Sequence, residues 1–133
     1  MKYMLDTNIC IEIIRKKPTK VFERLKRIDP SDICVSSVTY SELVYGVEKS
    51  QEVERNRLAL SLLFSHIYIA DYNVSAANDY GMIRAELERK GTPIGPLDSM
   101  IAAHARSLGC VIVTNNEKEF SRVSGLKVEN WVK

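Results

Sequence analysis

The stretch GTPIGPLDSMIAAHARSLGCVIVTNN, residues 91–116, carries the succession of local signals that decides the fold. Its opening GTPIGP is a turn signal, and Pro96 suits the first position of a helix predicted over residues 97–108. Gly109 marks the end of that helix, because glycine adopts the positive φ that a helix C-terminus often needs. The apolar run 111–114 then predicts a buried strand. A helix that leads directly into such a strand is typical of a parallel α/β sheet.

The rest of the chain repeats this alternation of short apolar runs with amphipathic segments of helical length. Such alternation predicts βαβ units and an α/β fold with a mostly parallel central sheet. At 133 residues the chain fits a single domain, residues 1–133. The predicted strands are residues 3–5, 33–36, 67–70 and 111–114, with a weaker one at 126–128, and the predicted helices are residues 9–16, 21–27, 38–49, 54–65, 74–89 and 97–108.

Composition narrows the class of protein only broadly. The formal net charge of +2 at pH 7 points to neither a nucleic-acid nor a membrane partner. Basic residues are concentrated between Arg15 and Arg27, where a solvated helix face is favoured over a phosphate-contacting edge. The three cysteines lack C-x-x-C spacing and are predicted to be buried, reduced thiols. Without a leader-like N-terminus or an apolar run of membrane length, the sequence predicts a cytoplasmic protein with no membrane partner.

Acidic and polar residues follow the predicted strands, at the sheet edge where ligands bind in parallel α/β proteins. Asp6 follows the first strand, Glu42 lies a few residues after the second, and Thr114 to Asn116 follow the fourth. Asp6 has a structural explanation as a helix cap, and Glu42 has one as the partner of Thr39 in a capping box. Asp98 has one as a complement to a helix dipole. These structural explanations are weaker for a group of acids near one edge of the sheet than for any one of the acids taken alone.

Asp98 favours a functional explanation, because at helical spacing it lies in line with the apolar stripe that must face the core. Carboxylates gathered at one sheet edge repel one another unless protons or a cation compensate. An all-oxygen set suits Mg²⁺ or Mn²⁺, and bound Mg²⁺ typically keeps water and substrate phosphate as further ligands. The sequence therefore predicts phosphate chemistry at a metal site. The apolar stripe comprises Ile101, Ala102, Ala105 and Leu108.

Other functional motifs are missing. His66 and His104 have no partner at metal-ligand spacing, and His104 falls off the apolar stripe, so both are assigned structural roles. The sequence has no GxxxxGK[ST] loop, GxGxxG fingerprint or GxSxG elbow. Two other classes stay open, a non-catalytic nucleic-acid-binding module and a receiver-like signalling domain. A receiver would want a lysine after the last core strand, where Thr114-Asn115-Asn116 stands.

Four groups of residues, in this order and spanning essentially the whole chain, resemble the motifs of the PIN-domain nucleases. More narrowly, they resemble those of the VapC toxins of bacterial toxin-antitoxin pairs, and the segment from Arg84 to Pro96 looks most like the VapC group of enteric bacteria. The groups are Met4-Leu5-Asp6-Thr7-Asn8; Ser36-Ser37-Val38 with Ser41-Glu42-Leu43 and Gly46; Gly95-Pro96-Leu97-Asp98 with Ile101-Ala102-Ala103-His104-Ala105; and Val113-Thr114-Asn115-Asn116 with Glu119-Phe120.

The resemblance implies a PIN-like three-layer α/β/α fold and a homodimer. It also implies a VapB-type antitoxin that binds and inhibits the protein and through which alone operator DNA is contacted. The implied activity is that of an Mg²⁺-dependent endoribonuclease, with Mn²⁺ as a substitute ion. In the enteric group the implied substrate is the anticodon stem-loop of initiator tRNA, whose cleavage inhibits translation.

By position, Asp6, Glu42 and Asp98 match the three acidic positions of the family. The resemblance implies that Asp6 and Asp98 are metal ligands. Side chains beside the acids are candidates for orienting ligands or water. These candidates are Thr7, Thr114 and Asn116.

The chain departs from the family after the fourth strand, where many members carry an aspartate and this chain carries Asn115 and Asn116. An amide oxygen is a poorer Mg²⁺ ligand than a carboxylate. We therefore expect Glu119 to supply the missing negative charge. The spacing Asn116-x-x-Glu119 repeats that of Thr39-x-x-Glu42 and predicts that both glutamates lie in the first turn of a helix.

Overall fold

The computed structural model of the chain describes residues 1–15 and 20–132. Its elements lie close to the predicted ranges, although the predicted end of the first helix, Lys16, and part of the basic segment fall outside the described residues. The strands are β1 Tyr3–Leu5, β2 Ile33–Ser36, β3 Tyr68–Ala70, β4 Val111–Val113 and β5 Val128–Glu129; the helices are α1 Thr7–Ile14, α2 Lys20–Leu25, α3 Ser37–Glu48, α4 Val53–Phe64, α5 Val74–Arg89, α6 Pro96–Leu108 and α7 Glu117–Phe120, with a short 3₁₀ helix at Pro30–Asp32.

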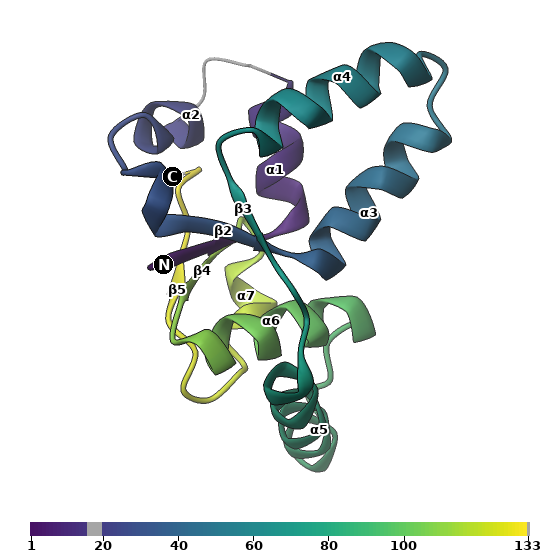
Figure 1. The fold of residues 1–133 in the computed structure, drawn as a ribbon. Helices are drawn as coiled ribbons and strands as arrows, with labels where there is room; N and C mark the ends of the chain where they lie inside the picture. Colours follow the sequence, from purple (N-terminus) through teal and green to yellow (C-terminus); the bar gives the residue numbers. More distant parts are fainter. Residues whose placement is uncertain (16–19, 133) are drawn as a thin grey trace.

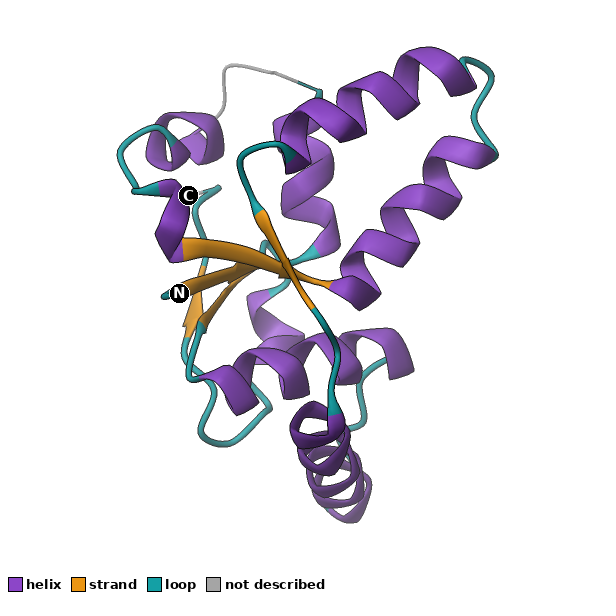
Figure 2. Ribbon diagram, in the orientation of Figure 1, coloured by secondary structure: helices purple, strands orange, loops and turns teal. Residues whose placement is uncertain are grey.

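The five described strands form one sheet in the order β3-β2-β1-β4-β5, and every pair of neighbouring strands is parallel. Helices cover both faces of this sheet (Figure 1, Figure 2). The predicted three-layer α/β/α fold with a parallel sheet is therefore confirmed. The strand order also differs from the order 2-1-3-4-5 of receiver-like domains, which argues against that alternative.

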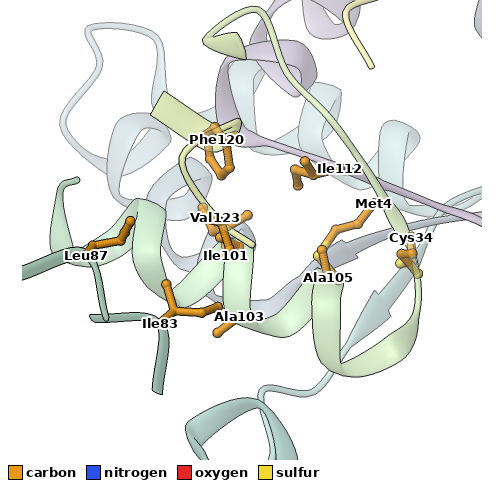
Figure 3. Packing of buried hydrophobic residues seen from close by; sticks show 12 residues of the cluster. Met4, Cys34, Ile83, Leu87, Ile101, Ala103, Ala105, Ile112, Phe120 and Val123 are labelled. Atoms are coloured by element: carbon orange, nitrogen blue, oxygen red, sulfur yellow. The ribbon is translucent and has the colours of Figure 1, made fainter. Parts of the chain in front are cut away.

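The alternating side chains of the strands divide the core between the two faces of the sheet. Met4 is paired with Cys34 on one side and Ile112 on the other, and all three belong to the cluster under α5 and α6. Leu5 and Val113 point the other way, into the cluster under α1 to α4. Figure 3 shows the first cluster, which joins the sheet to α5, α6 and α7.

The ends of α6 agree with the sequence. Pro96 occupies the first turn, and Gly109 ends the helix in the left-handed conformation with φ 71°. This conformation favours glycine because a side chain would meet the backbone there. The helix therefore begins at a defined residue, which fixes Asp98 in its first turn.

Two predictions about α6 are wrong. Leu108 is exposed rather than part of the buried stripe, and His104 is fully buried rather than off the stripe. His104 is buried because α6 is packed between the sheet and α5, which buries its middle on all sides. Leu108 is exposed because it is the last residue of the helix and lies beyond this packed middle. The His104 Nδ1 atom lies 2.8 Å from Ser36 Oγ, and burial lowers the pKa of the imidazole.

The three cysteines are buried and free, as predicted. Among the described residues, no helix is long and apolar enough to cross a membrane.

Candidate functional site

The four predicted acids lie on elements that begin at the carboxyl edge of the sheet. Asp6 follows β1 directly, and Glu42 is on α3, which begins where β2 ends. Asp98 is in the first turn of α6, and Glu119 is on α7, shortly after β4. The other three carboxylates all contribute to raising the pKa of Asp98. The fold therefore brings the four acids into one electrostatic neighbourhood.

Asp6 is both a helix cap and a buried acid. Its Oδ1 atom accepts a hydrogen bond from the Ile9 N–H at 3.1 Å, which caps α1 as predicted. Its Oδ2 atom accepts one from the Thr114 hydroxyl at 2.5 Å. Burial raises the pKa of Asp6, these hydrogen bonds oppose the rise, and the charge of Glu42 adds to it. The cap thus accounts for one carboxylate oxygen, and Thr114 orients the other.

Glu42 does not take part in a capping box, and the prediction that it lies in a first turn is wrong. Helix α3 follows β2 without a spacer, so the Ser36 hydroxyl caps it by accepting from the Val38 N–H at 3.1 Å. Glu42 is consequently one turn further along and accepts from the Thr7 hydroxyl at 2.7 Å. Thr39, the expected cap, is fully buried with its Oγ1 3.4 Å from that of Thr7.

Asp98 is half-buried at the start of α6, where Gly95 provides no side-chain cap. Its pKa is raised from an ordinary 3.8 to about 6. Burial is the largest cause, followed by a hydrogen bond with Glu119 and the charges of Glu119, Asp6 and Glu42. A carboxyl group with this pKa exchanges its proton near neutral pH, and any cation at the site competes with that proton.

Glu119 lies in the first turn of α7, as predicted. The Asn116 side-chain amide donates to Glu119 Oε2 at 2.9 Å, and the Asn116 backbone N–H donates to the Thr114 hydroxyl at 2.9 Å. Because Thr114 in turn donates to Asp6, a continuous series of hydrogen bonds runs from Glu119 to Asp6. The side chain of Asn116 therefore orients Glu119.

No lysine or arginine in residues 1–15 or 20–132 forms an ion pair with any of these four acids. In the same described part, no three His, Cys, Asp or Glu side chains converge closely enough to enclose a metal ion. Carboxylate oxygens without a cationic partner are donors that Mg²⁺ prefers, and Mg²⁺ is typically held by one or two carboxylates with water and phosphate completing the shell. The donor chemistry therefore suits the predicted ion.

Away from the four acids, an apolar groove of about 530 Å³ lies between α1, α2 and α4. Its lining is mostly aliphatic, and Leu58 and Leu62 of α4 are exposed there. Lys26, Arg55 and His66 are its polar lining residues, and no acid of the described chain lines it. Sequence analysis did not find this groove, because its walls come from helices far apart in the chain. The spacing of Leu58 and Leu62 by one helical turn was the available signal.

Comparison with known protein families identifies the class of protein to which this fold and this group of acids belong. The sequence pattern described as "PIN domain" matches residues 3–126. This range includes all four acids and the three polar residues that orient them.

Full-length relatives make the assignment narrower. The "tRNA(fMet)-specific endonuclease VapC" of Shigella flexneri is 53% identical over 131 residues, and that of Salmonella typhimurium is 50% identical over 131 residues, each covering 98% of both chains. The solved structure of "DNA bound VapBC from Salmonella typhimurium" superposes with a TM-score of 0.93 at 50% identity over 98% of both chains. The chain belongs to the PIN-domain family, within its group of VapC ribonucleases.

Proposed function

We propose that the chain is the toxin of a type II toxin-antitoxin pair, an endoribonuclease that cleaves initiator tRNA in the anticodon stem-loop and so inhibits translation. The observation that carries the proposal is the group of four acids at the carboxyl edge of the sheet, without a cationic partner among the described residues. Relatives named for action on tRNA(fMet), at 50% and 53% identity, support this choice of substrate.

The proposed cofactor is Mg²⁺, with Mn²⁺ as a substitute. Asp6 and Asp98 would hold it, and Glu42 and Glu119 would add negative charge around it. When bound, such an ion supplies an activated water and neutralises charge on the phosphodiester during in-line attack.

The protein's own residues prepare this chemistry by fixing oxygen atoms in place. Thr114 orients Asp6 Oδ2, and Thr7 orients Glu42 Oε1. Asn116 holds Glu119 Oε2 through its amide N–H. Below its pKa of about 6, Asp98 retains a proton and loses its charge, so the site is fully charged only at higher pH. Activity should therefore increase as the pH rises through this value.

The proposed partner is a VapB-type antitoxin, because solved relatives include VapBC assemblies. The apolar groove between α1, α2 and α4 fits an amphipathic antitoxin segment that carries acids toward Lys26 and Arg55. Leu62→Asp should consequently impair neutralisation by the antitoxin without reducing cleavage by the toxin alone. We also propose a homodimer, with operator DNA contacted only through the antitoxin.

The direct experiment is incubation of the purified chain with initiator tRNA, elongator tRNAs and a DNA copy of the anticodon stem-loop, with Mg²⁺ or with EDTA. The expected result is cleavage of initiator tRNA alone, in Mg²⁺ alone. Binding without cleavage under every condition would instead identify a non-catalytic nucleic-acid-binding module. Cleavage that persists in EDTA would contradict the cofactor but not the substrate.

A further inference from the structure

Asp98 and Glu119 lie on two different segments of the chain, and the side chain of one arginine connects these two segments by a hydrogen bond. Arg122 lies one turn after Glu119, and its Nη1 atom donates a hydrogen bond to the Pro93 carbonyl oxygen at 3.0 Å. Pro93 lies two residues before Gly95, the N-cap of the helix that carries Asp98. The bond therefore links the α7 region to the entrance of α6.

The segment that contains Pro93 has little regular structure to hold it. It leaves α5 with the Thr92 N–H bonded to the Leu87 carbonyl oxygen at 2.9 Å, and it enters α6 with the Ser99 N–H bonded to the Gly95 carbonyl oxygen at 2.8 Å. Between these points Pro93 has no N–H with which to anchor itself. Ile94 packs against the hydrophobic cluster under α5 and α6, and Arg122 holds the preceding carbonyl group from another part of the chain, so both restrict the path of the segment.

The path of this segment bears directly on the Asp98 carboxylate. The Asp98 Oδ2 atom lies close over Gly95, 3.9 Å from the position that a Cβ atom would take there. At the other end of the Arg122–Pro93 hydrogen bond, α7 is a single turn whose Phe120 is fully buried. Figure 3 shows Phe120 and Val123 in the cluster that includes Ile101 of α6. Movement of the 93–95 segment would therefore shift Asp98 relative to an anchored Glu119.

An electrostatic effect of Arg122 on the acids does not explain the position of its side chain. Burial and neighbouring acids raise the pKa of Asp98, and no arginine is among the causes of the shift. The guanidinium group also forms no ion pair with an acid of the described residues. Its defined interaction is the hydrogen bond to a neutral carbonyl, which acts through geometry.

We propose that Arg122 is a positioning residue that sets the separation of the Asp98 and Glu119 carboxylates for binding a divalent cation. This inference rests on the proposed metal-dependent function. Outer-shell residues that orient metal ligands change metal affinity by about 10- to 100-fold when they are lost. Arg122 would belong to this kind of residue although it contacts neither acid.

The chain contains a matched control. Arg106, in the last turn of α6, also donates to a backbone carbonyl, that of Ser124, at 3.0 Å, and it pairs with Asp79 at 3.0 Å. It is thus a bracing arginine at the end of α6 opposite to Asp98. Replacing it should reduce stability without changing the cation site.

The experiment compares Arg122→Ala, Arg122→Lys and Arg106→Ala with the wild-type chain. Calorimetric titration with Mn²⁺ measures cation affinity, and exchange of the amide hydrogens of Ile94, Gly95, Leu97 and Asp98 measures the mobility of the segment in metal-free protein. Arg122→Ala should weaken Mn²⁺ binding about tenfold and speed exchange at these amides. Arg122→Lys, which keeps one donor, should recover part of both losses. Arg106→Ala should lower thermal stability but leave Mn²⁺ affinity and exchange at these amides at wild-type values.

Equal Mn²⁺ affinity in Arg122→Ala and wild type would overturn the proposal, as would equal losses in Arg122→Ala and Arg106→Ala. A role in contacting RNA phosphate would also overturn it. In that case Mn²⁺ affinity would be unchanged, and the slope of log RNA affinity against log salt would fall by about 0.7. If the wild-type chain itself binds no Mn²⁺, the proposed cofactor fails first, and that failure is distinct from failure of the brace.

Discussion

Two acids on the helix surfaces and two acids at the carboxyl edge of the sheet have pKa values that are shifted in opposite directions. On the surface, the Arg57 guanidinium bonds Glu48 at 2.8 Å and lowers its pKa, and Lys90 does the same for Glu86. At the edge, burial raises the pKa of both Asp6 and Asp98. The same functional group is therefore compensated by the protein in one region and left uncompensated in the other.

This difference separates stability from function. A surface acid with a cationic partner has no reason to bind a further cation, and its ion pair contributes little to stability. An edge acid is surrounded by like charges, so a proton or a cation relieves the repulsion. The edge acids are accordingly the ones on which activity should depend, while the surface acids serve as controls of identical chemistry.

The largest expected effect is on cleavage by Asp98→Asn, which removes the charge at nearly constant shape. We expect cleavage of initiator tRNA to fall by about 100-fold or more, because losing a metal ligand exceeds the 10- to 100-fold cost of losing an outer-shell partner. Thermal stability should hold or increase, since repulsion with Glu119 and Asp6 is relieved. Glu48→Gln is the control, and single-turnover cleavage is the measurement. Cleavage by Asp98→Asn at the wild-type rate would remove Asp98 from the site.

A smaller effect should separate Glu119 from Asn116. Glu119→Gln should raise the Mg²⁺ concentration for half-maximal cleavage by about tenfold, because it removes charge. Asn116→Ala should raise it less, because Asn116 only orients Glu119. Metal titrations of cleavage, run beside thermal melts, test both variants. If Glu119 only stabilises the first turn of α7, its loss would lower the stability of the protein by about 0.5 to 2 kcal/mol and leave the Mg²⁺ requirement unchanged.

The two regions should also respond to pH with opposite signs. The folded-state pKa of Asp98, about 6, exceeds its ordinary 3.8, so the folded protein holds this proton more tightly than the unfolded chain does. Its contribution to stability is therefore lost as the pH rises from about 4 to about 6. The pKa of Glu48 is lowered, so its contribution is instead lost as the pH falls through the folded-state value.

Thermal melts in EDTA across this range test the signs. Asp98→Asn should become more stable relative to the wild-type chain as the pH rises, and Glu48→Gln should become less stable. The same pH dependence in both variants would contradict the division between the regions.

The smallest expected effect is that of the surface pair itself. Arg57→Met should lower the free energy of unfolding only slightly, because Arg57 and Glu48 are both substantially exposed. High salt should reduce this difference. Denaturant unfolding at low and high salt provides the measurement. A loss of cleavage in this variant would show that the surface ion pair affects the activity of the site.

The sequence predicted the fold well because local signals were strong and agreed with one another. Apolar runs as short as Tyr3–Leu5 were sufficient, since helices and turns on either side defined them. Pro96 and Gly109 likewise fixed the limits of α6. The rule that ligands bind beyond the carboxyl ends of parallel strands also pointed to the edge of the sheet at which Asp6 and Glu42 lie.

What could not be predicted depended on the point at which one element meets the next and on partners distant in sequence. The capping box at Thr39 was locally reasonable, but β2 runs directly into α3, and Ser36 takes the cap. His104 was misplaced because sequence spacing reveals one face of a helix and not a second covering layer. The bond from Arg122 to Pro93 spans 29 residues, and no periodic pattern marks it.

The central claim, that the edge acids form an uncompensated site for a divalent cation, is most directly tested by thermal stability with and without Mg²⁺ at neutral pH. Mg²⁺ should stabilise the wild-type chain and Glu48→Gln equally, by about 2.7 kcal/mol at a hundred times the dissociation constant. It should stabilise Asp98→Asn far less. Equal stabilisation of all three proteins, or of none, would contradict the account.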